Sequence, residues 1–148
     1  MVPLRLLLVD DSRSFLYLAS KFLEQFSEAT VVGLAVGGAE GLQQAQSTRP
    51  DLVLADLSMP KMPGLELITR LREVLPQIGI IALTNLDNEA YRQAALKAGA
   101  DDFVPKGAMH EELLPAIRRV ARARGLLGPD QGPSGDSPEA GQGARGST

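Results

Sequence analysis

The stretch "LRLLLVDD", Leu4 to Asp11, is the part of the sequence that points most directly to the fold. Its first six residues are apolar except for Arg5, which is typical of a strand buried on both faces of a sheet. Two adjacent carboxylates, Asp10 and Asp11, follow the run at once. Charges at the end of a buried strand are costly unless something compensates them, so this strand end is the first candidate for a site.

Four more apolar runs of strand length follow along the chain. They are "TVVGLAV" (30–36), "DLVLAD" (51–56), "IGIIALT" (78–84) and "DFVP" (102–105). Helix-like stretches separate the runs, so strand and helix alternate strictly. This alternation predicts an α/β, doubly wound fold, with five parallel strands and helices on both faces of the sheet.

Apolar spacing and capping residues locate the helices. The first helix is expected to bury one face made of Phe15, Leu18, Ala19, Phe22, Leu23 and Phe26, with Ser12 or Asp11 as its N-cap. Leu65, Ile68, Leu71 and Leu75 share a face of another helix, which Pro76 ends. A third helix has Asp87 or Asn88 as cap and Gly99 as stop, and a last one covers 111–124 with Pro115 in its first turns.

Length and composition predict one domain, residues 1–127, followed by a Gly/Pro-rich tail, 128–148, that we expect to be disordered. The net charge of −3 argues against direct nucleic-acid binding, and we interpret the basic cluster "RRVARAR" (118–124) as a solvated helix face. The absence of cysteine and of a long apolar segment predicts a soluble, cytoplasmic protein with no membrane partner. His110 is expected to be a solvated residue.

Polar residues stand at the predicted strand ends: Asp10 and Asp11, Asp56, Thr84 and Lys106. In doubly wound sheets the carboxyl ends of the strands form the ligand-binding edge. Two carboxylates about 4 Å apart repel by roughly 4 kcal/mol at an effective dielectric of 20. Either one acid is therefore protonated or a cation lies among them, and oxygen ligands without Cys or His favour Mg²⁺ or Mn²⁺.

These residues, with "DLSMPKMPGLEL" after the third strand and "KAGADDFVPK" into the fifth, resemble the receiver domain of two-component response regulators. The similarity covers about residues 4–127. It implies a flavodoxin-like (βα)5 fold with strand order 2-1-3-4-5. It also implies a phosphoacceptor signalling switch of a phosphorelay, not an enzyme.

The resemblance also implies a role for each site residue. Asp56 would accept a phosphoryl group, and Mg²⁺ would be held by Asp10, Asp11, Asp56 and the backbone carbonyl of Ser58. Thr84 and Lys106 would contact the phosphoryl oxygens, and Phe103 would change rotamer when Thr84 moves. The implied partners are a sensor histidine kinase or phosphotransfer protein, and a downstream protein that recognises the face of the fourth helix, fifth strand and last helix.

Three of these residues, taken singly, could have purely structural roles. Asp11 alone could be an N-cap, Thr84 a β-branched strand residue, and Phe103 a core residue. The sequence also departs from the family pattern at Pro63, at Asn85 and at Gly107. Asn85 follows the conserved hydroxyl, where it could narrow access to the phosphoryl group, and Gly107 removes the proline that often follows the conserved lysine.

Three alternative functions share parts of this residue pattern. A Mg²⁺-dependent phosphoaspartate hydrolase needs a second acid two residues after the nucleophile, where this chain has Ser58. A scaffold that is never phosphorylated would not need the complete set of acids, hydroxyl and lysine. The third alternative is the receiver fragment of a helix-turn-helix transcriptional regulator, because "KG" at 106–107 resembles such receivers.

Overall fold

The structure is a computed structural model, and it describes residues 2–126. The strands are β1 (Leu4–Asp10), β2 (Ala29–Val36), β3 (Leu52–Ala55), β4 (Gly79–Thr84) and β5 (Asp102–Pro105). The helices are α1 (Arg13–Leu23), α2 (Gly38–Thr48), α3 (Gly64–Val74), α4 (Glu89–Ala98) and α5 (Met109–Arg124), with a short 3₁₀ turn, η1 (Lys106–Ala108), before α5.

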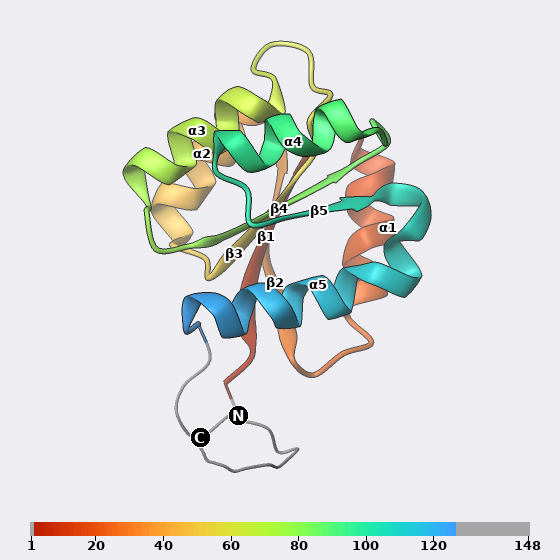
Figure 1. The fold of residues 1–148 in the computed structure, drawn as a ribbon. Helices are drawn as coiled ribbons and strands as arrows, with labels where there is room; N and C mark the ends of the chain where they lie inside the picture. Colours follow the sequence, from red (N-terminus) through yellow and green to blue (C-terminus); the bar gives the residue numbers. More distant parts are fainter. Residues whose placement is uncertain (1, 127–148) are drawn as a thin grey trace.

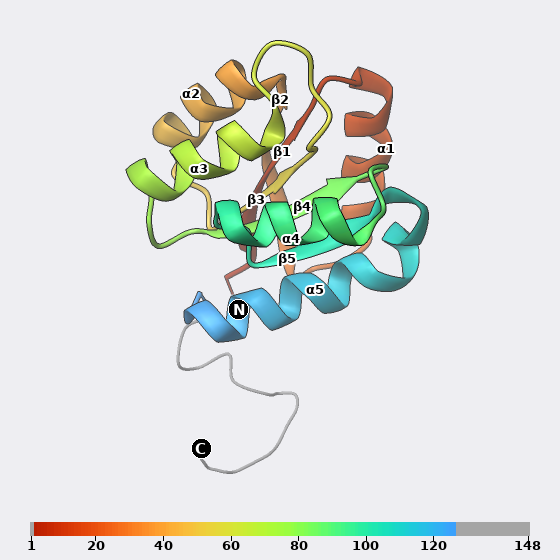
Figure 2. The same cartoon turned by 45° about the horizontal axis from the view of Figure 1, so that its top comes forward.

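The five strands form one parallel sheet in the order β2-β1-β3-β4-β5. Helices cover both faces, as Figure 1 shows, with α2, α3 and α4 on one side of the sheet and α1 and α5 on the other. Figure 2 shows the same layers tilted forward. The predicted doubly wound, flavodoxin-like fold and its strand order are therefore confirmed.

Two apolar cores lie on opposite faces of the sheet because successive strand residues point to opposite sides. Leu6 and Leu8 of β1 pack with α1 and α5, whereas Leu7 and Val9 pack with α2, α3 and α4. Since both sets of side chains are buried, the strand is apolar from Leu6 to Val9 instead of alternating.

The interpretation of Leu18 as a core residue is wrong. Its side chain is 60% exposed, and Leu16 is buried in its place. The two residues are separated by about 200° around the helix. The side of α1 that faces the sheet is a stripe that includes Leu16, Ala19 and Leu23, and Leu18 lies on the opposite side.

Capping side chains define two helix starts that the sequence left open. Ser12 is the N-cap of α1 and accepts a hydrogen bond from the backbone N–H of Phe15. Asn88 caps α4 in the same way through Tyr91. Helix α5 begins two residues earlier than predicted, at Met109, so Pro115 lies beyond its first turn.

The predicted end of the domain at residue 127 and the predicted tail, 128–148, lie outside the described residues. Among residues 2–126, the structure contains no helix of the length and apolarity that a membrane span requires.

Candidate phosphoacceptor and metal site

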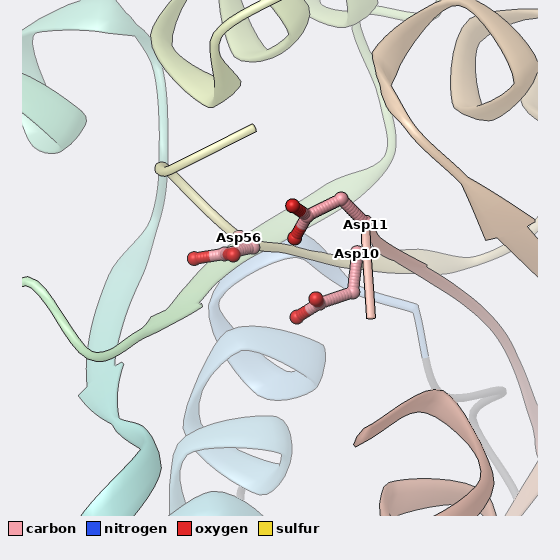
Figure 3. Close-up of side chains that lie close together, drawn as sticks. All are labelled: Asp10, Asp11 and Asp56. Atoms are coloured by element: carbon pink, nitrogen blue, oxygen red, sulfur yellow. The ribbon is translucent and has the colours of Figure 1, made fainter. Parts of the chain in front are cut away.

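Three carboxylates meet at the carboxyl ends of β1 and β3. Asp10 and Asp56 are buried, with 2% and 4% of their surface exposed, whereas Asp11 is exposed. One oxygen from each of the three residues lies within 4.8 Å of the others. Figure 3 shows Asp10 and Asp11 extending from the end of β1 and Asp56 from the end of β3. The structure thus brings together the three acids that the sequence placed at this edge.

Backbone N–H groups orient both buried carboxylates. The N–H of Ser12 donates to Asp10 Oδ1 at 2.9 Å, and the N–H of Ser58 donates to Asp56 Oδ1 at 3.3 Å. Each donor follows its acid by two residues, so the backbone after each strand turns back towards the carboxylate at the strand end. Both carboxylates are held in the site by the turn that follows them.

The loop after Asp56 is held close to it by Gly64. The N–H of Gly64 donates to the carbonyl of Leu57 at 3.1 Å. A Cβ at position 64 would lie 2.5 Å from the Leu57 Cα and closer still to the carbonyl oxygen of Asp56. Only glycine allows α3 to begin this close to the strand end.

Lys106 supplies a cation to the acidic cluster. Its Nζ lies 2.8 Å from Asp10 Oδ2 and 3.6 Å from Asp56 Oδ2. Burial raises the pKa of the Asp10 carboxyl above 3.8, while the hydrogen bonds from Lys106 and from the Ser12 N–H work against that rise. The sequence predicted that Lys106 would reach this edge, but not that its ammonium would lie between two of the acids.

The donor set fits a hard divalent cation. Three carboxylates converge, the chain has no cysteine, and its only histidine, His110, belongs to α5 and packs against Phe22. Oxygen ligands of this kind suit Mg²⁺ or Mn²⁺. Ser58 lines the same pocket of about 370 Å³, and the role of its carbonyl as a ligand stays a prediction.

Thr84 ends β4 beside the site. It is fully buried, and its Oγ1 accepts a hydrogen bond from the Leu86 N–H at 3.2 Å. Phe103 on β5 is 5% exposed and lies in register with Ala82 of β4. Thr84 and Ala82 are two residues apart on one strand, so the side chains of Thr84 and Phe103 lie on the same face of the sheet.

The three departures from the family pattern also border the site or its loops. Asn85 is exposed and lines the pocket that holds the acids, where it can narrow access. Pro63 precedes α3 as its N-cap residue. Gly107 lies in η1, and no cis peptide bond occurs in residues 2–126.

The basic cluster of α5 is largely paired within the chain. Arg118 pairs with Glu28 at 2.8 Å, Arg119 with Asp102 at 2.7 Å, and Arg124 with Asp101 at 2.8 Å. These contacts give the arginines structural partners, which the interpretation as a simple solvated face did not include.

Sequence reasoning missed Phe15 as a site residue. Its ring lies under the Lys106 ammonium, 4.0 Å from Nζ to the ring centroid, and it lines the same pocket as the acids. Helical spacing indicated only that Phe15 belongs to the core side of α1. No sequence signal places it against Lys106, because the two residues meet only through the fold.

Comparisons with known proteins agree with this geometry. Residues 6–118 match the family model described as the response regulator receiver domain. The chain is 39% identical over 137 residues to the response regulator MprA of Mycobacterium sp. (strain KMS), covering 93% of this chain and 56% of that protein. It is 34% identical over 131 residues to the response regulator protein VraR of Staphylococcus aureus (strain Mu3 / ATCC 700698), covering 87% of this chain and 62% of that one.

A solved structure shows the same fold. The response regulator domain of Thermotoga maritima CheB superimposes with a TM-score of 0.77 at 28% identity, over 81% of this chain and 97% of that domain. The chain spans less than two thirds of the length of the two curated relatives. With the family match over most of the chain, and with the acids, hydroxyl and lysine at the expected strand ends, the chain belongs to the response regulator receiver domain family.

Proposed function

We propose that this chain is a phosphoacceptor switch in which Asp56 receives a phosphoryl group. The observation that carries the proposal is the position of the Asp56 carboxylate. It is buried at the end of β3, oriented by the Ser58 N–H, and lined up in one open pocket with two further acids and the Lys106 ammonium.

The transfer needs charge neutralisation because both reactants are anionic. An Asp56 oxygen attacks phosphorus as the bond from phosphorus to the donor nitrogen or oxygen breaks, and the product is an acyl phosphate on Asp56. Lys106 lies where it can pair with a phosphoryl oxygen. Mg²⁺ held by Asp10, Asp11, Asp56 and the Ser58 carbonyl would supply the remaining positive charge.

Mass spectrometry after incubation with acetyl phosphate and Mg²⁺ tests the proposal. The parent protein should gain the mass of one phosphoryl group, and Asp56→Asn should gain none. The exposed Asp87→Asn is the matched control and should be modified like the parent. Equal modification of Asp56→Asn and the parent would reject Asp56 as the acceptor.

The proposed output is a change at the face formed by α4, β5 and α5. If Thr84 moves its hydroxyl from Leu86 towards a phosphoryl oxygen, it leaves space on the face of the sheet that it shares with Phe103. We expect Thr84→Ala to accept phosphate at Asp56 yet lose most of this response. NMR spectra with and without beryllofluoride measure it, and shift changes around Phe103 as large as those of the parent would reject the relay.

The proposed partners are proteins: a histidine kinase or phosphotransfer protein as donor, and a target that reads the α4, β5 and α5 face. Cytoplasmic location is part of this proposal. A second proposal is that the chain acts as the receiver part of a longer regulator, because its curated relatives are longer than the chain. Comparing the length of the native gene product with residues 1–148 distinguishes a receiver that acts alone from the receiver part of a longer regulator.

A further inference from the structure

The ring of Phe15 forms one wall of the position that Lys106 occupies. The Lys106 Nζ lies 4.0 Å from the centroid of the ring, well within the distance at which an aromatic face attracts a cation. Only 12% of the Lys106 side chain is exposed, so this attraction acts at a site from which most water is excluded. Phe15 itself is half-buried and packs against the core beneath α1 and α5.

Phe15 and Lys106 belong to a closed circuit of contacts. Asp10 Oδ1 accepts from the Ser12 N–H, and the Ser12 hydroxyl accepts from the Phe15 N–H. The Phe15 ring then faces the Lys106 ammonium, which returns to Asp10 through Oδ2. The turn that holds the buried acid therefore also fixes the ring, and the ring and the acid together fix the ammonium.

An aromatic ring suits this position for an electrostatic reason. The lysine stem is flexible, and its ammonium needs favourable surroundings on every side once it leaves water. Asp10 and Asp56 provide two of them. A further carboxylate at position 15 would add to the repulsion within the acidic cluster and would compete for a metal ion, whereas a ring attracts the cation without adding a charge or a metal ligand.

We infer that Phe15 is a positioning residue for phosphoryl transfer, and that it acts by holding the Lys106 ammonium beside Asp56. This inference rests on the proposed phosphoacceptor function. The competing account is that Phe15 only fills space in the core. The two accounts differ in one property: cation attraction depends on the electron density of the ring, whereas packing depends on its shape.

Fluorinated phenylalanines at position 15 separate the two accounts, because fluorine withdraws density from the ring face with little change in shape. Phe15 is replaced by 4-fluoro-, 3,5-difluoro- and 3,4,5-trifluorophenylalanine in the full chain. Two quantities are measured: the NMR shift of the Lys106 ε-protons, which ring current moves upfield, and the rate of Asp56 phosphorylation by acetyl phosphate with Mg²⁺. The Phe15→Leu variant gives the reference value, which is the Lys106 ε-proton shift when no aromatic ring is present at position 15.

We expect the ε-proton shift to move stepwise towards the Phe15→Leu value as fluorines are added. The phosphorylation rate should fall in the same order, by about three- to tenfold across the series. Phe26 is the matched control, because its ring packs edge-on against Phe22 at 5.3 Å. The same substitutions there should change neither quantity.

An ε-proton shift that stays at the parent value throughout the series would overturn the inference, whatever the phosphorylation result. A shift that moves while the rate stays constant would also overturn it, because the ring would then hold Lys106 without affecting transfer. A parent protein that acetyl phosphate does not modify would reject the proposed function and, with it, the role of Phe15 in transfer. The ε-proton shifts of the fluorinated variants would then report only the contact between the Phe15 ring and Lys106.

Discussion

Asp10 combines burial with a charge, and the balance between them sets a pH dependence. Burial raises its pKa above 3.8 despite the Lys106 ammonium, so the folded protein binds a proton at Asp10 more tightly than the unfolded chain does. Stability from this residue therefore decreases as the pH rises from about 3.8 through the folded pKa, and it is constant above that.

Asp10→Asn removes this titration. We expect its free energy of unfolding, relative to the parent, to rise with pH across that window in metal-free buffer. Urea unfolding with a chelator at a series of pH values measures the difference. A difference that is independent of pH, or that falls as the pH rises, would contradict the raised pKa.

Metal binding should stabilise the fold, because a divalent cation relieves the repulsion among the three acids. At a free concentration one hundred times the dissociation constant, a ligand specific to the folded state contributes about 2.7 kcal/mol. Thermal unfolding during a Mg²⁺ titration, at constant ionic strength, measures the effect. No rise of the midpoint at millimolar metal would argue against the metal site.

Asp11→Asn is the informative variant for the same titration. Asp11 is exposed, so its replacement leaves both cores unchanged. We expect the variant to be more stable than the parent without metal, because one repelling charge is gone, and to gain less stability from Mg²⁺.

The residues of the site could be predicted because each lies at the end of a strand or directly after it, and parallel strands end at one edge. The contacts between their side chains could not be predicted in this way. The sequence shows that Asp10, Asp56 and Lys106 converge, but the distances that place the ammonium between the acids depend on side-chain rotamers and on η1. The contact of Phe15 with Lys106 depends in addition on the rotation of α1.

At the scale of elements, the junction between β3 and α3 tolerates almost no extra volume. Gly64→Ala would place a Cβ against the backbone of Asp56 and Leu57, which cannot rotate away as a side chain would. We expect a loss of about 1–3 kcal/mol of stability, as for other overpacked sites, and a weaker response to Mg²⁺ because Asp56 is displaced.

Gly107→Ala is the control for this variant. Apart from its two neighbours in the chain, no residue described by the structure has a heavy atom within 4 Å of the Cβ that it would add, and Gly107 is not among the glycines with positive φ. Urea unfolding of both variants tests the prediction. Equal stability of Gly64→Ala and Gly107→Ala would show that the junction relaxes.

Periodicity located the helices well but not their orientation about their own axes. Leu18 fitted the apolar spacing, yet it lies on the exposed side of α1 together with Tyr17. The apolar residues of α1 extend around more than one face, so spacing alone could not select the buried stripe. The choice is made by the sheet, which packs against Leu16 and Ala19.

At the scale of the molecule, residues 128–148 contain no apolar side chain larger than alanine apart from proline, so the sequence gives them little to contribute to an apolar core. We therefore expect deletion of residues 128–148 to leave thermal unfolding and phosphorylation by acetyl phosphate unchanged. The comparison uses the full chain and residues 1–127 side by side. A lower midpoint or a slower reaction in the shortened chain would show that the tail contributes to the domain.

The whole architecture could be predicted because alternation of apolar runs and helices leaves few possible topologies. The order of the strands came from the family resemblance, since alternation alone does not choose among doubly wound arrangements. The junction at Gly64 could not be predicted in detail, because the approach of α3 to the strand end is a property of the packed structure.

The lysine that lies among the acids has a consequence for synthesis of the protein. Asp10, Asp11 and Asp56 all precede Lys106 in the chain, and β5 is the last strand to leave the ribosome. A nascent chain that ends before β5 therefore carries the three acids without the internal cation that the folded domain supplies. Without a bound metal ion, electrostatic repulsion then disfavours early closure of this edge, so we expect the three acids to come together more readily once Lys106 has been added to the chain.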